Sequence, residues 1–203
     1  MTTAACWEAA NGQLPAEISD IFDMSNEPSL TNLQLLSAFP EWEVPLPGGD
    51  RSSFTDVLAL ARNAVGLVCI AVEAKVDEEF GPTLFSKRAE ASVGQNERID
   101  YLHKVLRLKA SLPDTIRYQL LHRTASALFT AEEFHANTAV MLVHSFSLTA
   151  RWREDYMAFC SAMGAKHLSD SLCVVPGFDG PKLYLAWCAG NKKFLEVELP
   201  SVV

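Results

Sequence analysis

The chain has 203 residues, of which 49% are hydrophobic, and it carries a formal net charge of −8 at pH 7. A chain of this length and hydrophobicity can bury a sizeable core, which excludes a disordered protein and predicts a single domain over residues 1–203. The acidic balance argues against a protein that coats nucleic acid with its whole surface.

Positive charge is concentrated in one segment. Residues 83–123 contain eight Lys or Arg and four acids, so this segment carries +4 while the remainder of the chain carries −12. Two interpretations stay open, a solvated helix surface and a face that follows the phosphates of a nucleic acid.

The five cysteines are scattered and show neither CxxC spacing nor a Cys/His zinc pattern. They predict reduced thiols in the cytoplasm. The first residues lack the basic and apolar regions of a signal peptide, and no apolar run is long enough to cross a membrane. We therefore expect no contact with a membrane. Of the histidines, His122 and His144 are expected at the edge of the core or hydrogen-bonded, rather than as ligands.

The first fifty residues are the least regular part of the chain. Their apolar spacing predicts helices over residues 16–24 and 30–39. Residues 41–47 alternate in polarity and predict a strand, which two prolines would confine to the edge of a sheet. A turn-rich loop over residues 48–53 follows. We expect this region to be appended to a core over residues 54–190.

Residues 54–76 predict a β-hairpin. Two apolar segments flank a short turn at Asn63–Gly66, and the second segment is rich in β-branched residues. A helix over residues 54–64 is the competing interpretation, because Val57, Leu58, Ala61 and Val65 have partial helical spacing.

Three charged residues interrupt the apolar hairpin: Asp56, Glu73 and Lys75. An unpaired charge in a core strand is costly, so their presence needs a reason. Strand alternation places Glu73 and Lys75 on one face, and the hairpin register places Asp56 opposite residues 73–74. The three side chains should therefore meet.

Two carboxylates at one point are hard oxygen ligands that suit Mg²⁺ or Mn²⁺. We therefore interpret Asp56 and Glu73 as metal ligands for phosphodiester hydrolysis, with Lys75 offsetting the charge that grows on the phosphoryl oxygens. The alternative is a structural ion pair across the hairpin.

The remainder of the chain alternates helices and strands. Apolar spacing predicts helices over 98–108, 111–129 and 151–163, the second of them opening at the capping-box spacing of Ser111 and Asp114. Short apolar runs predict strands over 139–143, 182–187 and 193–199. This order predicts an α/β fold, a three-layer sandwich with a mixed central sheet flanked by helices.

The middle predicted helix offers three further candidates, Arg117, Gln119 and Arg123. Arg117 falls within the apolar arc of the helix, so its guanidinium needs a partner; it either snorkels to solvent or contacts a site carboxylate or a substrate phosphate. Gln119 and Arg123 are four residues apart and form either a surface pair or part of the site. We interpret the three as candidate substrate-binding residues.

The hairpin motif resembles that of the PD-(D/E)xK nuclease superfamily. The match consists of Asp56 followed, after sixteen intervening residues, by Glu73, Ala74 and Lys75. Glu-x-Lys alone is expected by chance in a chain of this composition, so its position at the end of the most β-like run gives it weight. Thr55 stands where the superfamily often has proline. The resemblance implies that the two acids bind the metal and that Lys75 stabilises charge.

A wider resemblance covers residues 54–190. Residues 72–82 (VEAKVDEEFGP), 117–124 (RYQLLHRT) and 143–146 (VHSF) are similar to a bacterial branch of uncharacterised proteins with this fold. The resemblance implies a restriction-endonuclease-like core, Mg²⁺ or Mn²⁺ as cofactor and nucleic acid, DNA above all, as substrate. It also allows a homodimer, since many nucleases of this fold act as dimers. The alternative function is a non-catalytic module of the same fold that binds a protein partner or nucleic acid.

Overall fold

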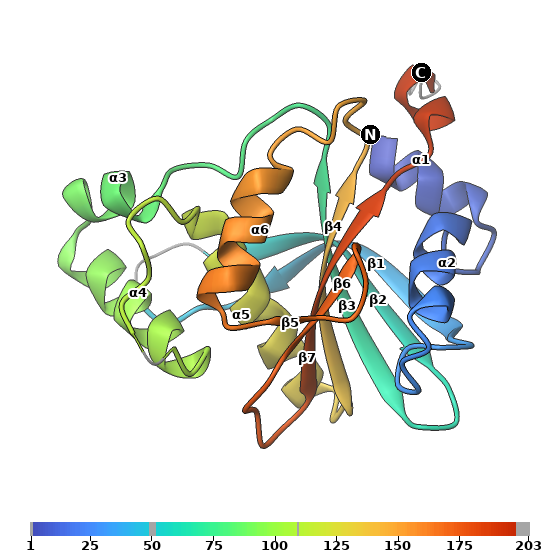
Figure 1. Ribbon diagram of the computed structural model, residues 1–203, viewed down its shortest axis with the longest axis horizontal. Helices are drawn as coiled ribbons and strands as arrows, with labels where there is room; N and C mark the ends of the chain where they lie inside the picture. Colours follow the sequence, from blue (N-terminus) through green and yellow to red (C-terminus); the bar gives the residue numbers. More distant parts are fainter. Residues whose placement is uncertain (1, 49–51, 109, 198–203) are drawn as a thin grey trace.

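The computed structural model describes residues 2–48, 52–108 and 110–197. One mixed seven-stranded sheet lies between two layers of helices (Figure 1), so the predicted three-layer α/β sandwich is confirmed. Within the described residues, no helix combines the length and the apolar character needed to cross a membrane.

The centre of the sheet is parallel and both of its sides are antiparallel. The strands lie in the order β1-β2-β3-β4-β7-β6-β5, and the β3–β4 and β4–β7 pairs are the parallel ones. The strand bounds are Gln34–Val44 (β1), Ser53–Arg62 (β2), Leu67–Lys75 (β3), Thr138–Ser145 (β4), Lys166–His167 (β5), Leu172–Val175 (β6) and Lys182–Ala189 (β7). Because β3, β4 and β7 run the same way, their carboxyl ends meet at one edge of the sheet, where ligands bind in many open α/β sheets.

Each face of the sheet has its own layer of helices and its own apolar core. Helices α1 and α2 cover one face, and α3 to α6 lie on the other (Figure 1). The helix bounds are Thr2–Ala9 (α1), Ala16–Met24 (α2), Leu84–Ala89 (α3), Val93–Val105 (α4), Tyr118–Glu133 (α5) and Arg153–Ala162 (α6), and a 3₁₀ helix follows at Lys192–Glu196 (η1). Strand β4 is buried along its whole length, as expected for a strand covered on both faces.

The hairpin prediction is confirmed. Strands β2 and β3 pair antiparallel from Arg62↔Leu67 to Val57↔Val72, and their turn is closed by the Asn63 side chain, which accepts a hydrogen bond from the backbone N–H of Val65 at 2.8 Å. The competing helix over residues 54–64 is excluded, since residues 53–62 form β2.

The region before the hairpin differs from the prediction in one element. The helix over residues 16–24 is present as α2, but the helix over 30–39 is wrong, because β1 spans Gln34–Val44. Its exposure alternates along the chain, as in an edge strand with one half-buried face. Of the predicted strand at 41–47, residues 41–44 form the end of β1, and residues 45–47 lie beyond it. Residues 49–51 of the predicted loop lie outside the described residues.

Two helix starts and one further strand were also predicted wrongly. The helix expected from Ser111 begins only at Tyr118, and the capping box lies instead between Ser92 and Gln95 at the start of α4, ahead of the predicted start at residue 98. The strand expected over 193–199 is a 3₁₀ helix as far as Glu196, and residues 198 and 199 are outside the described residues. Short local patterns of this kind recur by chance, so packing decides which of them is used.

Candidate functional site

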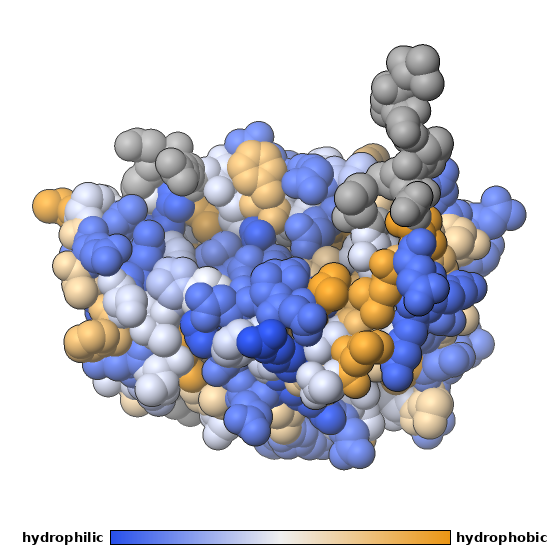
Figure 2. Space-filling model, turned by 90° about the horizontal axis from the view of Figure 1, so that it is seen from above, coloured by the Kyte–Doolittle hydropathy of each residue, from blue (hydrophilic) through white to orange (hydrophobic). Residues whose placement is uncertain are grey.

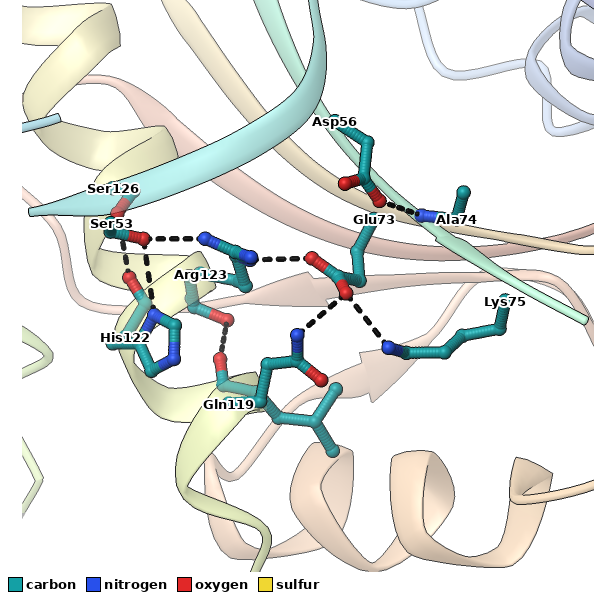
Figure 3. Close-up of polar contacts among 11 residues, drawn as sticks. Ser53, Asp56, Glu73, Ala74, Lys75, Gln119, His122, Arg123 and Ser126 are labelled. Atoms are coloured by element: carbon teal, nitrogen blue, oxygen red, sulfur yellow. Dashed lines mark hydrogen bonds and ion pairs between the residues drawn. The ribbon is translucent and has the colours of Figure 1, made fainter. Parts of the chain in front are cut away.

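The predicted site lies at the carboxyl edge of the parallel strands (Figure 3). Glu73 and Lys75 end β3, and Asp56 comes from the adjacent antiparallel strand β2. Their side chains lie on the face of the sheet that α5 covers, because the alternate residues Cys69 and Ala71 pack in the core on that face. The hairpin therefore brings all three residues to one place, as the sequence predicted.

Asp56 is fixed by the backbone of the neighbouring strand. Its Oδ2 accepts a hydrogen bond of 2.7 Å from the N–H of Ala74, while its Oδ1 has no hydrogen bond to any described residue. Burial raises the pKa of Asp56 to about 6, and the negative charge of Glu73 acts in the same direction. The site therefore holds one carboxylate that resists ionisation and has a free oxygen.

Glu73 is almost fully buried, at 3% exposure, and has three donors. Its Oε1 receives the Gln119 amide at 2.7 Å and the Lys75 ammonium at 2.9 Å, and its Oε2 receives Nε of Arg123. An ionised carboxylate offers about four acceptor positions, so one position on Oε2 is left over. Glu73 is thus the centre of the hydrogen-bond network in Figure 3.

Helix α5 supplies the donors because its first turns face the site. Gln119 and Arg123 are one helical turn apart and lie on the same side of the helix. Arg123 also donates to the hydroxyl of Ser53 at 2.7 Å, and that hydroxyl lies 3.1 Å from Nδ1 of His122. Burial, together with the charge of Arg123, lowers the pKa of His122 to about 3, so this imidazole is neutral.

One buried polar atom of the site lacks a partner among the described residues. The Gln119 Oε1 is shielded from solvent and accepts no hydrogen bond there. The amide orientation is fixed, since only its NH₂ group can donate to Glu73. An unpaired buried acceptor costs about 1–3 kcal/mol, so it marks a position where a cation or donor would be stabilising.

The site borders a hydrophilic cavity of about 360 Å³. Among its lining residues, the four acids Glu41, Asp56, Glu73 and Glu78 outnumber the two cations, Lys75 and Arg123. Figure 2 looks onto this end of the molecule and shows hydrophilic residues across its centre. The excess of carboxylates favours a cationic ligand over a bare anion.

Arg117 is not brought to this group. Its guanidinium pairs with Glu79 at 2.9 Å and with Asp155 at 2.8 Å, donates to the carbonyl of Gly81 and lies over the Trp152 ring. It therefore ties the segment after β3 to α6. The partner that the sequence required for Arg117 exists, but it is neither Asp56 nor Glu73.

The assembled site thus contains Asp56, Glu73, Lys75, Gln119 and Arg123. Sequence reasoning missed Ser53 and His122 as members of the network. Ser53 begins the strand that carries Asp56, and His122 lies next to Arg123, so proximity to predicted site residues was the one available signal.

Comparison with known proteins gives a family. A sequence profile described as "Domain of unknown function (DUF6946)" matches residues 1–192. The chain belongs to the DUF6946 family. No curated protein and no solved structure matched the chain. The DUF6946 match includes every site residue and the N-terminal segment, and its description assigns no activity, so function has to be inferred from the site.

Proposed function

We propose that the protein is a divalent-metal-dependent phosphodiester hydrolase that acts on nucleic acid, with DNA as the preferred substrate. The observation that carries the proposal is the meeting of Asp56, Glu73 and Lys75 at the carboxyl edge of the sheet, beside a cavity rich in carboxylates. The resemblance of this motif to PD-(D/E)xK nucleases supports the same reaction. The free state of all five cysteines fits a reducing compartment such as the cytoplasm.

The donor set fits Mg²⁺ or Mn²⁺. Asp56 Oδ1 and the remaining position of Glu73 Oε2 are hard oxygen donors, whereas the unpaired Gln119 Oε1 points away from both carboxylates in Figure 3. Asp56 and Glu73 would hold the ion. When bound, such an ion lowers the pKa of a water ligand and offsets negative charge on a phosphoryl group.

The chain's own residues supply orientation and positive charge. Arg123 and Gln119 fix the carboxylate of Glu73 from α5, so its orientation does not depend on the flexible part of its own side chain. Lys75 is held 2.9 Å from Glu73 and is 5% exposed, so its ammonium is placed in a low-dielectric setting where it stabilises phosphoryl charge strongly. The N-terminus of α5 adds the positive end of a helix dipole at the same edge.

A second hollow continues past these residues. A cavity of about 330 Å³ is lined by Lys75, Gln119 and Arg123 as well, together with Glu79 and Tyr118. The three site residues therefore line both hollows. This arrangement suits a chain-like substrate that runs through both with one phosphate at Lys75.

The assay is cleavage of supercoiled plasmid, linear duplex DNA, single-stranded DNA and RNA with Mg²⁺ or Mn²⁺, and with a chelator. We expect metal-dependent cleavage that falls at least about 100-fold in Lys75→Ala, the scale seen on removal of a transition-state donor. Lys104→Ala, on the exposed side of α4, is the matched control and should cleave like wild type. Cleavage that persists in Lys75→Ala would come from a contaminant and defeat the proposal.

The second candidate is a non-catalytic module of the same fold. The three donors on Glu73 favour it, because two cations and an amide already compensate this carboxylate without a metal. In that case the wild-type protein should bind nucleic acid or a protein partner, show no cleavage, and bind with the same affinity with and without divalent metal.

A further inference from the structure

A second group of ligating side chains lies on the opposite face of the same sheet. Cys6 on α1, Glu17 on α2 and His144 on β4 have ligand atoms that all lie within 4.8 Å of one another. His144 pairs in register with Ala74 and Cys188, and its side chain points toward α1 and α2, whereas Glu73 faces α5. The group is therefore separate from the site described above.

His144 is the unusual member. It is fully buried, and neither of its ring nitrogens makes a hydrogen bond within the described part of the chain. Its Nε2 lies 3.5 Å from Oε1 of Glu17, and its ring packs against Phe146 with centroids 4.4 Å apart. A buried imidazole whose polar neighbour is a carboxylate at 3.5 Å is poorly satisfied, and imidazole nitrogen is a common metal ligand.

Two of the three distances match those between ligands of one zinc ion. From ordinary zinc–ligand bond lengths, a tetrahedral site separates S and O ligands by about 3.6 Å and N and O ligands by about 3.4 Å. Here the Cys6 Sγ lies 3.4 Å from Glu17 Oε1, and His144 Nε2 lies 3.5 Å from the same oxygen. The third pair, Cys6 Sγ and His144 Nε2, lies within 4.8 Å, against about 3.6 Å in such a site, so these two atoms have to approach each other to share one ion.

The surroundings leave one side of the group open. A cavity of about 260 Å³ is lined by Cys6, Glu17, Asn191, Lys193 and Phe194. The backbone N–H of Asn191 donates to Glu17 Oε1 at 3.0 Å and so orients the carboxylate, as outer partners of metal ligands do. A fourth ligand can reach the group from this cavity.

We propose that Cys6, Glu17 and His144 bind one zinc ion, with the fourth position open to the cavity. One sulfur, one nitrogen and one oxygen ligand form a softer set than the carboxylates on the other face, so the two sites select different metals. On binding, the thiol proton of Cys6 leaves to solvent and the thiolate becomes the ligand. The ion joins both N-terminal helices to the central strand. This inference does not depend on the proposed hydrolase.

The test is a Co²⁺ titration of the full-length protein after removal of bound metal. We expect one equivalent of Co²⁺ with the visible bands of a tetrahedral site and a thiolate-to-cobalt charge-transfer band, both bleached by one equivalent of Zn²⁺. Cys6→Ser should lose the charge-transfer band. Glu17→Gln, which changes a side chain that is 21% exposed and so should fold, is expected to weaken Zn²⁺ binding at least about tenfold.

The matched control is Cys173→Ser. Cys173 Sγ lies 3.3 Å from Nδ1 of His167, which makes it the Cys/His pair most similar in composition to the proposed site. This variant should keep the full spectrum. No charge-transfer band in the wild-type protein at excess Co²⁺ would overturn the proposal without any variant. A band that survives in Cys6→Ser or disappears in Cys173→Ser would overturn it as well.

Discussion

Arg123 on α5 donates a hydrogen bond from its Nε to Glu73 on β3, joining a helix to the sheet through a buried carboxylate. Lys75, two residues after Glu73, is the second cation on that carboxylate, at 2.9 Å. A buried charge that loses its partner is strongly destabilising, because its desolvation is no longer compensated. The stability of this edge of the sheet therefore depends on Glu73.

Glu73→Gln should lower the free energy of unfolding by about 3 kcal/mol, since it leaves the buried Lys75 and the partly buried Arg123 without this negative partner. Urea denaturation measures the change. Glu90→Gln, an exposed acid at the end of α3, should change it by less than about 0.5 kcal/mol. Equal stability of the two variants would show that the network contributes little.

Ionisation of Asp56 should lower the free energy of unfolding as the pH rises. An acid whose pKa is raised on folding, here to about 6, binds protons more tightly in the folded state, so stability falls between about pH 4 and pH 6. Asp56→Asn keeps an acceptor for the Ala74 N–H but removes the charge. Allowing for partial solvent screening, it should raise the free energy of unfolding by about 1–2 kcal/mol at pH 7.5. At pH 4 wild type and Asp56→Asn should be equally stable. A variant that is less stable than wild type at pH 7.5 would contradict this account.

Lys75 should affect metal affinity and cleavage in opposite directions. Lys75→Met removes a positive charge 2.9 Å from Glu73, so Mn²⁺ should bind roughly three- to tenfold more tightly. Cleavage should be lost in the same variant, because the charge that stabilises the phosphoryl oxygens is gone. Calorimetry and the plasmid assay measure the two effects. Weaker Mn²⁺ binding would mean that Lys75 positions the ligands instead.

Substitutions of Arg117 and Arg123 should differ in their effect on Mn²⁺ affinity. Arg117→Met breaks the pairs with Glu79 and Asp155 and should cost about 1–2 kcal/mol of stability while leaving Mn²⁺ affinity unchanged. Arg123→Met should change both quantities, because Arg123 contacts Glu73. The measurements are urea denaturation and calorimetry on the two variants. A change in Mn²⁺ affinity in Arg117→Met would show that Arg117 does influence the metal site.

The hairpin and its three charged residues could be predicted from the sequence because they depend on local rules. The turn at Asn63–Gly66 sets the register, and strand alternation then fixes which side chains face each other. Gln119 and Arg123 could also be predicted, since one helical turn separates them. The start of α5 was not, because Ser111 and Asp114 have capping-box spacing without forming a helix.

The group on the other face could not be found in this way. Cys6, Glu17 and His144 come from three elements, and the chain between Glu17 and His144 includes both strands of the hairpin. Known zinc motifs place ligands a few residues apart, so a site assembled by the fold has no local pattern. His144 was expected at the edge of the core or hydrogen-bonded; it is fully buried, and neither ring nitrogen has a hydrogen-bond partner among the described residues.

The central claim is that Asp56 and Glu73 hold one hard divalent ion, and calorimetric titration with Mn²⁺ tests it most directly. Wild-type protein and Asp100→Ala, which changes an exposed acid on α4, should each bind one ion at the site, whereas Asp56→Ala should lose this binding. The same Mn²⁺ isotherm in wild type and Asp56→Ala, or no binding in either, would contradict the claim.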